Sequence, residues 1–192
     1  MSSGPITRWL DFLLSKPLRH LLEKPERMLK RYVKQGMTVL DVGCGEGSYS
    51  IGMARLVGSN GRVIAVDPQP AAIEALKKRA EQTDVSTQIE SRACTEQDLG
   101  IDDVTGQVEF ALAVYVIHHA TDARRLMSNV YRALKPGGMF LVVEPRHHAS
   151  AAECEATRAM ARDSGLTISD HPKLWRDWAV LLVKDVPISG DT

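Results

Sequence analysis

The stretch from Val39 to Ser48 constrains the fold of this chain more than any other segment. Residues 39–42 are β-formers interrupted by one acid, Asp41, and three glycines then alternate with other residues. This order predicts a buried strand that runs into a tight turn and then into a helix. Glycines in such a turn can adopt a positive φ and let a ligand approach closely, because they have no Cβ. The stretch therefore predicts a nucleotide-binding type of turn at the carboxyl edge of a sheet.

Strand-like and helix-like segments alternate from residue 37 onward. We expect strands at Thr38–Val42, Val63–Val66, Thr87–Arg92, Val108–Ile117, Met139–Val143, Leu166–Ser169 and Ala179–Lys184. Helices are expected between them, at Tyr49–Leu56, Ala71–Gln82, Asp122–Leu134 and Ala151–Ser164. This alternation predicts an α/β fold with a doubly wound, mainly parallel seven-stranded sheet and helices on both faces. The last two strands are predicted to form a C-terminal antiparallel hairpin.

Residues 1–36 differ in pattern from the rest and predict an N-terminal helical extension. Apolar residues cluster between Trp9 and Leu14, and Pro25 suits the first turn of a helix over Glu26–Val33 that Gly36 would end. We expect this extension to be a lid or packing helices, followed by a single domain at 37–192. An amphipathic helix that contacts a membrane or a partner is the alternative.

Composition excludes several classes of protein. Apolar residues make up 44% of the 192 residues, and 24 basic residues balance 24 acidic ones, which argues against a nucleic-acid partner. The three cysteines are widely spaced and odd in number, which favours a reducing compartment. No signal-type segment or membrane-spanning run is visible. We therefore expect a cytoplasmic protein.

Four segments, in order, resemble the motifs of the class I S-adenosylmethionine (SAM)-dependent methyltransferases. They are Val39–Ser48, Val63–Pro68, Phe110–His119 and the L-K-P-G-G turn within Leu134–Leu141. The resemblance implies that residues 37–192 form a SAM-dependent methyltransferase domain, with S-adenosyl-L-homocysteine as the product. The antiparallel strand near the C-terminus also fits the sheet of this family.

Asp67 is the strongest single candidate for cofactor binding. It lies twenty residues after Gly47, at the end of the second predicted strand. An acid at that place can accept hydrogen bonds from both ribose hydroxyls of a nucleoside that lies across the carboxyl edge of the sheet. The alternative is a helix N-cap before Pro68.

The resemblance implies further cofactor contacts, with Asp41 at the methionine end. The expected cofactor-binding residues are Asp41, Gly43, Cys44, Gly45, Gly47, Asp67, Pro68, Gln69, Ala93, Cys94 and Tyr115. Many members of the family carry an acid after the third strand, whereas this chain has Arg92 there and no acid before Glu96 and Asp98. A backbone carbonyl or Asp98 is expected to contact the adenine amino group instead.

The ends of the fourth and fifth predicted strands hold the candidates for catalysis. These are Tyr115, His118, His119, Glu144, His147 and His148. We expect His118 or His119, with Tyr115 nearby, to remove a proton from the acceptor or to orient it, because histidine titrates near neutral pH. Surface histidines on loop tips are the alternative interpretation of both pairs. The spacing matches no ligand pattern for a metal, so none is expected.

These features favour a methyltransferase that transfers a methyl group to N or O of a small or lipid-like acceptor. The alternative is a SAM-binding protein with little catalytic activity that acts as a binding or regulatory module. An NAD-dependent oxidoreductase is disfavoured, because a dinucleotide fold has G-x-G-x-x-G where this chain has Gly43, Gly45 and Gly47.

Overall fold

The computed structural model describes residues 25–95, 97–146, 150–174 and 177–187. The apolar cluster at 9–14, Glu96 and the pair His147 and His148 lie outside the described residues. The strands are β1 (Thr38–Val42), β2 (Arg62–Asp67), β3 (Ile89–Ala93), β4 (Val108–Val114), β5 (Leu134–Pro145), β6 (Leu166–Asp170) and β7 (Asp177–Lys184). The α-helices are α2 (Pro25–Leu29), α3 (Ser48–Val57), α4 (Pro70–Glu81), α5 (Ala123–Ala133) and α6 (Ala151–Asp163). Three short 3₁₀ helices are η1 (Ser86–Gln88), η2 (Asp102–Val104) and η3 (Ile117–His119).

The strands form one seven-stranded sheet in the order β3-β2-β1-β4-β5-β7-β6. The pairs among β1 to β5 are parallel, and β7 is antiparallel to both of its neighbours, β5 and β6. The predicted α/β fold, the seven strands and the C-terminal hairpin are confirmed. All of the parallel strands end at one edge, where the glycine turn begins.

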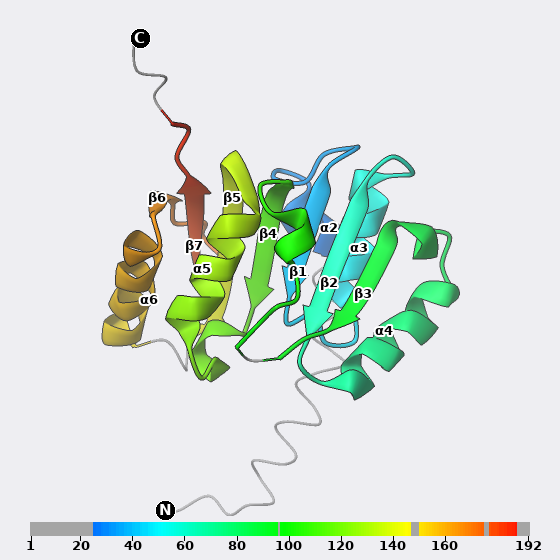
Figure 1. Cartoon of the computed structure of the whole chain (residues 1–192), viewed down its shortest axis with the longest axis horizontal. Helices are drawn as coiled ribbons and strands as arrows, with labels where there is room; N and C mark the ends of the chain where they lie inside the picture. Colours follow the sequence, from blue (N-terminus) through cyan, green and yellow to red (C-terminus); the bar gives the residue numbers. More distant parts are fainter. Residues whose placement is uncertain (1–24, 96, 147–149, 175–176, 188–192) are drawn as a thin grey trace, which may run out of the picture.

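Side chains of alternate residues in the strands point to opposite faces of the sheet and build two apolar cores. Leu40, Ile64 and Phe140 face the core beneath α5 and α6, whereas Val39 and Leu141 face the core beneath α2, α3 and α4. Figure 1 shows α5 and α6 in front of the sheet and α2 and α3 behind it. Helices therefore cover both faces, as predicted from the alternation of elements.

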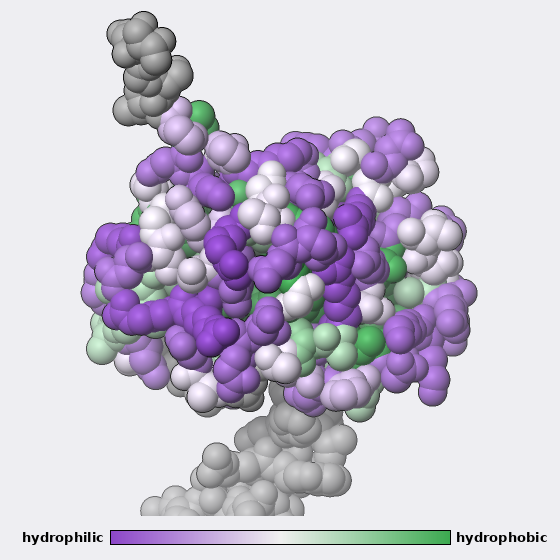
Figure 2. Space-filling model, in the orientation of Figure 1, coloured by the Kyte–Doolittle hydropathy of each residue, from purple (hydrophilic) through white to green (hydrophobic). Residues whose placement is uncertain are grey.

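The helix α5 shows why the outer surface is polar. Its apolar residues at helical spacing, Leu126, Met127, Val130 and Ala133, are buried against the sheet. Its remaining positions are mainly polar, and hydrophilic side chains dominate the face of the molecule that Figure 2 shows. None of the helices in the described part of the chain has the length and apolar character needed to cross a membrane.

Residues 25–36 pack tightly against the sheet. The predicted helix over Glu26–Val33 is shorter in the structure and ends at Leu29, after which the chain turns. The Tyr32 ring stacks on Phe110 of β4 at 5.6 Å between centroids, and Leu29 and Val33 are buried in the same core. Whether a helical extension covers all of residues 1–36 stays a prediction.

The end of α5 differs from its expected form. The predicted helix Asp122–Leu134 was expected to stop at the turn Lys135–Gly138, with the strand beginning at Met139. In the structure Leu134 already pairs with Val108 as the first residue of β5, and the register shifts before Phe110 pairs with Met139. The turn is thus a bulge within a longer strand, where Gly137 has a φ of 78°.

Candidate active site

The glycine turn between β1 and α3 combines two packing contacts with one open position. Gly43, Gly45 and Gly47 have φ values of 69°, 52° and 81°. A Cβ at Gly43 would lie 2.4 Å from Val116 Cγ2, and a Cβ at Gly47 would lie 2.0 Å from Leu76 Cδ1. A Cβ at Gly45 would meet no atom within 4 Å. The outer glycines are therefore required by packing, whereas the middle one borders open space that a ligand can approach.

Asp67 joins this turn to the end of β2. One carboxylate oxygen, Oδ2, accepts a hydrogen bond from the Gly45 amide at 2.9 Å, and the other accepts one from the Gln69 amide at 2.9 Å. The side chain is buried, and Pro70 then starts α4 without a side-chain cap from Gln69. The carboxylate therefore fixes the turn, and the remaining lone pairs of its oxygens are available to ribose hydroxyls.

Asp41 is buried beneath the same turn. Ser50, in the first turn of α3, donates its hydroxyl hydrogen to Asp41 Oδ2 at 2.6 Å. Burial raises the pKa of Asp41 to about 7, with a further rise from the Asp67 charge and an opposing effect of the Ser50 hydrogen bond. Ser50 is a residue that sequence reasoning missed, although its place one helical turn after Gly47 was a usable signal. Cys44 is buried too, and burial raises the pKa of its thiol, which is therefore unreactive.

The segment after β3 closes the other side of the turn. The Cys94 amide donates to the Asp67 carbonyl at 3.1 Å, so Ala93 and Cys94 lie beside the end of β2. Asp98 is exposed, and one of its oxygens accepts a hydrogen bond from the Gly100 amide at 2.9 Å. An adenine contact by Asp98 stays a prediction.

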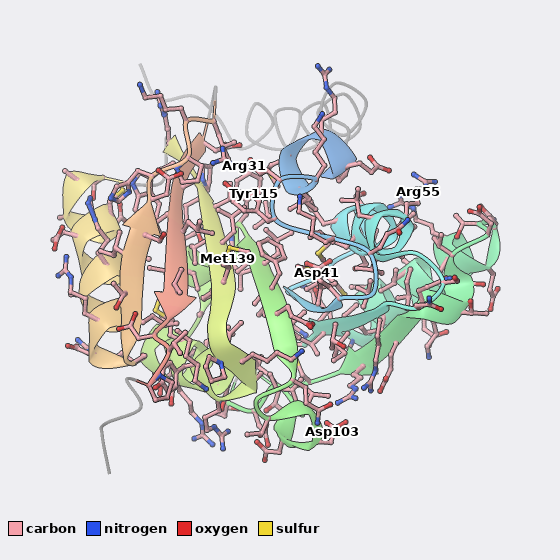
Figure 3. The ribbon with its side chains drawn as sticks, turned by 90° about the horizontal axis from the view of Figure 1, so that it is seen from above. Arg31, Asp41, Arg55, Asp103, Tyr115 and Met139 are labelled. Atoms are coloured by element: carbon pink, nitrogen blue, oxygen red, sulfur yellow. The ribbon has the colours of Figure 1, made fainter. Side chains whose placement is uncertain are left out.

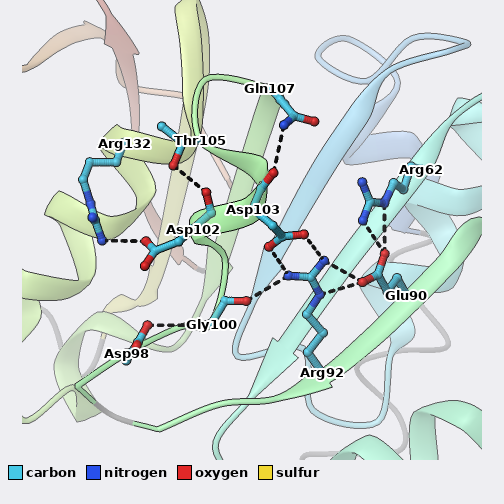
Figure 4. A network of polar contacts seen from close by, with 10 residues as sticks. All are labelled: Arg62, Glu90, Arg92, Asp98, Gly100, Asp102, Asp103, Thr105, Gln107 and Arg132. Carbon is cyan, nitrogen blue, oxygen red and sulfur yellow. Dashed lines mark hydrogen bonds and ion pairs between the residues drawn. The ribbon is translucent and has the colours of Figure 1, made fainter.

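Arg92 does not face the cofactor turn as an isolated charge, because a polar network engages its guanidinium (Figure 4). It donates to Glu90 at 2.7 Å, to the Gly100 carbonyl at 2.8 Å and to both carboxylate oxygens of Asp103 at 2.7 and 2.9 Å. Glu90 also accepts from Arg62. Arg92 therefore anchors the loop that follows β3, a role that the sequence did not reveal.

The end of β4 reverses direction at Tyr115. This residue is the only non-glycine with a positive φ among the described residues, at 60°, and its amide still donates to the Val143 carbonyl at 2.8 Å. The predicted strand to Ile117 is therefore wrong in its last three residues, since β4 ends at Val114 and η3 begins at Ile117. The reversal places Val116 against Gly43. Such a strained conformation costs about 1–3 kcal/mol and is concentrated at functional sites.

Glu144 holds the segment that follows. Its Oε1 accepts a hydrogen bond from the Ile117 amide at 2.8 Å, and its Oε2 contacts His118 Nδ1. Glu144 is 4% exposed, and burial raises its pKa while the His118 partner opposes that rise. The His118 side chain is 19% exposed, so its ring remains accessible at the carboxyl edge. The His119 ring lies beside it at a tilt of 44°, with 3.8 Å between ring centroids.

The structure thus brings the sequence-predicted residues to one edge in two groups. Asp41, the glycines and Asp67 form the first group, and Tyr115, His118 and Glu144 form the second. Figure 3 labels Asp41 of β1 and Tyr115, which directly follows the last residue of β4. Within the described ranges, no three His, Cys, Asp or Glu side chains are grouped closely enough to bind a metal ion.

The strand order, the glycine turn and the acid at the end of β2 together define the class I SAM-dependent methyltransferases. Residues 33–184 match the model of a family described as a methyltransferase domain. The chain belongs to this family, and SAM is the cofactor of its class.

Known proteins support that assignment. An Aquifex aeolicus SAM-dependent methyltransferase of known structure superposes with a TM-score of 0.79 at 20% identity, over 95% of this chain and 100% of that one. A ubiquinone biosynthesis O-methyltransferase from Nitrobacter winogradskyi is 36% identical over 54% of this chain and 37% of its own length. A ubiquinone/menaquinone biosynthesis C-methyltransferase from Enterobacter is 28% identical over 62% of this chain and 49% of its own length. The chain spans half or less of the length of these curated relatives.

Proposed function

We propose that this protein transfers the methyl group of SAM to an oxygen or nitrogen of a small or lipid-like acceptor, with His118 as the proton acceptor. The observation that carries the proposal is the contact between His118 and the buried Glu144. His118 lies two residues after Val116, and Val116 packs against Gly43 of the glycine turn. A histidine oriented by a carboxylate therefore sits close to where the cofactor of this class binds.

The residues around the glycine turn fit that cofactor. The open position at Gly45 admits the ligand, Asp67 is placed to accept the ribose hydroxyls, and Asp41 supplies negative charge near the methionine end. Pro68, Gln69, Ala93 and Cys94 are proposed to border the adenine. When bound, SAM supplies a methyl group on a positively charged sulfur, which needs no further activation by the protein.

The proposed role of His118 follows from its orientation. Glu144 binds Nδ1 of the ring and thereby favours the tautomer with its proton on that nitrogen. Nε2 is then the basic nitrogen, and it takes the proton that an acceptor hydroxyl or amine loses as the new bond to the methyl carbon forms. Glu144 stabilises the resulting imidazolium. Tyr115, at the strained end of β4, is proposed to line the same site.

The names of the relatives support one acceptor class over another. One relative is named for O-methylation and one for C-methylation in the biosynthesis of quinones. The first name supports the proposed transfer to oxygen, and neither of the two names points to an amine. We further propose that specificity comes from residues 1–35 and from the loops after β4 and β5. The three free cysteines support a cytoplasmic location.

The test has two steps. Calorimetry with SAM establishes cofactor binding, and release of S-adenosylhomocysteine is then measured with phenols, catechols and amines. We expect His118→Gln to lower turnover with little change in SAM affinity, and His119→Gln to serve as the matched control with a smaller loss. Unchanged turnover in both variants would remove the proposed role of these histidines.

The second candidate is a SAM-binding protein with little catalytic activity. Backbone amides donate hydrogen bonds to both carboxylate oxygens of Asp67. These contacts order the glycine turn without any contribution from the histidines, which favours this second candidate. Tight SAM binding without S-adenosylhomocysteine release for any acceptor class would favour this candidate.

A further inference from the structure

Asp41 and Asp67 are two buried acids beside the glycine turn, and neutral groups hold them both. They are 2% and 5% exposed. The donors are the Ser50 hydroxyl for Asp41, at 2.6 Å, and the Gly45 and Gln69 amides for Asp67, at 2.9 Å each. Burying two carboxylates side by side without a cation is costly. Either a bound proton or a positively charged ligand removes that cost.

The groups that surround Asp41 supply no positive charge of their own. Ser50 approaches from α3, Asp67 from β2 and Cys44 from the glycine turn. Within the described part of the chain, three factors set the pKa of Asp41: its burial, the hydrogen bonding from Ser50 and the charge of Asp67.

The more distant titratable groups do not neutralise the pair either. Cys94, after β3, has a pKa raised to about 11 by burial and by the Asp67 and Asp98 charges. Arg79 of α4 binds the outer side of the turn, where it donates to the Glu46 carbonyl at 2.9 Å and to the Ser48 hydroxyl at 3.2 Å.

We propose that SAM binding is coupled to proton release at Asp41: the positive charge of the cofactor replaces a proton that the Asp41 carboxyl group holds in the cofactor-free protein. The proton leaves the carboxyl group for the solvent, and no bond of the cofactor changes. This inference rests on the proposed cofactor site and adds that the site responds to the positive charge of the cofactor. It makes cofactor affinity depend on pH in a defined direction.

The direction follows from the raised pKa of Asp41, about 7. Below that pH the carboxyl group is protonated in the free protein, whereas a cationic ligand favours the carboxylate. SAM affinity is therefore expected to rise about tenfold per pH unit between roughly pH 5 and 6.5, as required when one proton is released per ligand. Above pH 7 it levels off.

Titration calorimetry of SAM at pH 6, in two buffers that differ in ionisation enthalpy, measures the released protons. We expect close to one proton per bound SAM in the wild-type protein. Asp41→Asn keeps an acceptor for Ser50 but removes the titrating group, so the release is lost and the affinity no longer changes between pH 5 and 7. Ser50→Ala keeps the carboxyl group but removes its hydroxyl donor, which shifts the release to higher pH.

The possible outcomes separate this inference from the proposed function. SAM binding without proton release in the wild type, or a release that persists in Asp41→Asn, overturns the coupling and leaves the cofactor assignment intact. If Asp41→Asn does not fold, Ser50→Ala provides the test. A pH profile of proton release that is the same in Ser50→Ala as in the wild type also overturns the coupling. Absence of SAM binding at every pH contradicts the proposed function itself.

Discussion

The two groups of the site hold their buried acids in different ways. Asp41 and Asp67, on the side of the glycine turn, accept hydrogen bonds from a hydroxyl and from backbone amides within the described residues. Glu144, at the end of β5, pairs with the ring of His118. Because the donors to Asp41 and Asp67 are neutral, the negative charge of these carboxylates is available to a cationic ligand. The carboxylate of Glu144 instead orients the His118 ring. From this difference we propose that the side of the glycine turn binds positive charge and that the side of His118 moves a proton.

Glu144→Gln tests the proton-moving side and has the largest expected effect. The new amide can donate a hydrogen bond to Nδ1, which moves the ring proton to Nε2 and removes the base. We expect turnover to fall about 100-fold, at the low end of the usual contribution of a general base. SAM affinity by calorimetry is the control. Turnover within twofold of wild type would indicate that the contact between Glu144 and His118 only stabilises the position of η3.

Asp67→Asn tests the charge-binding side. Asparagine can accept only one of the two backbone hydrogen bonds and loses the charge offered to the ribose. We expect SAM affinity to fall roughly 50-fold, because a hydrogen bond to a charged group contributes about 1.5–3 kcal/mol. Turnover at saturating SAM should change far less. A variant that loses turnover but keeps its affinity would contradict the division of roles.

Gly47→Ala and Gly45→Ala form a matched pair on the same turn. Alanine at 47 would place its Cβ 2.0 Å from Leu76 Cδ1, whereas alanine at 45 meets no protein atom within 4 Å. Both substitutions strain a positive φ, but only the first overpacks the core. We expect about 2 kcal/mol more loss in the free energy of unfolding for Gly47→Ala. Urea titration measures it, and equal losses would contradict the packing argument.

Arg92→Lys sharpens the comparison at the edge of the site and has the smallest expected effect. Lysine cannot reproduce the paired hydrogen bonds to Asp103, so the loop after β3 loosens. We expect the KM for SAM to rise about threefold with kcat unchanged, equivalent to less than 1 kcal/mol. Arg62→Lys is the matched control, because Arg62 hydrogen-bonds to Glu90, and no hydrogen bond in the described part of the chain joins its side chain to the loop. An equal change in both variants would argue against an anchoring role.

The features that follow from local pattern were predictable. β1 has the bounds expected from its run of β-formers, and Asp67 ends β2 as expected from the acid after Val66. Parallel strands that alternate with helices leave one choice for the edge at which their carboxyl ends meet. The cofactor side of the site could therefore be assembled from the sequence.

Features that depend on distant contacts were not predictable. β-forming residues continue to Ile117, yet the chain turns at Tyr115. The turned segment is held by Glu144, which lies 27 residues beyond Ile117 and accepts a hydrogen bond from the Ile117 amide. The pairing of Arg92 with Asp103 likewise joins residues 11 apart through a loop without periodicity. Hydrophobic pattern carries no information about such side-chain hydrogen bonds. The residues His118 and Glu144 were therefore predictable as candidates at the strand ends, whereas the contact between them was not.

The position of β7 has a consequence for how the protein is made. This last strand, Asp177–Lys184, lies between β5 and β6 and pairs with both. During synthesis, β1 to β4 leave the ribosome long before residue 184, so the half with the cofactor turn can form early. The slot beside β5, which carries Glu144, is filled only when translation has passed the final strand. The strand order thus allows the half with the glycine turn to form before the half that supports His118 is complete.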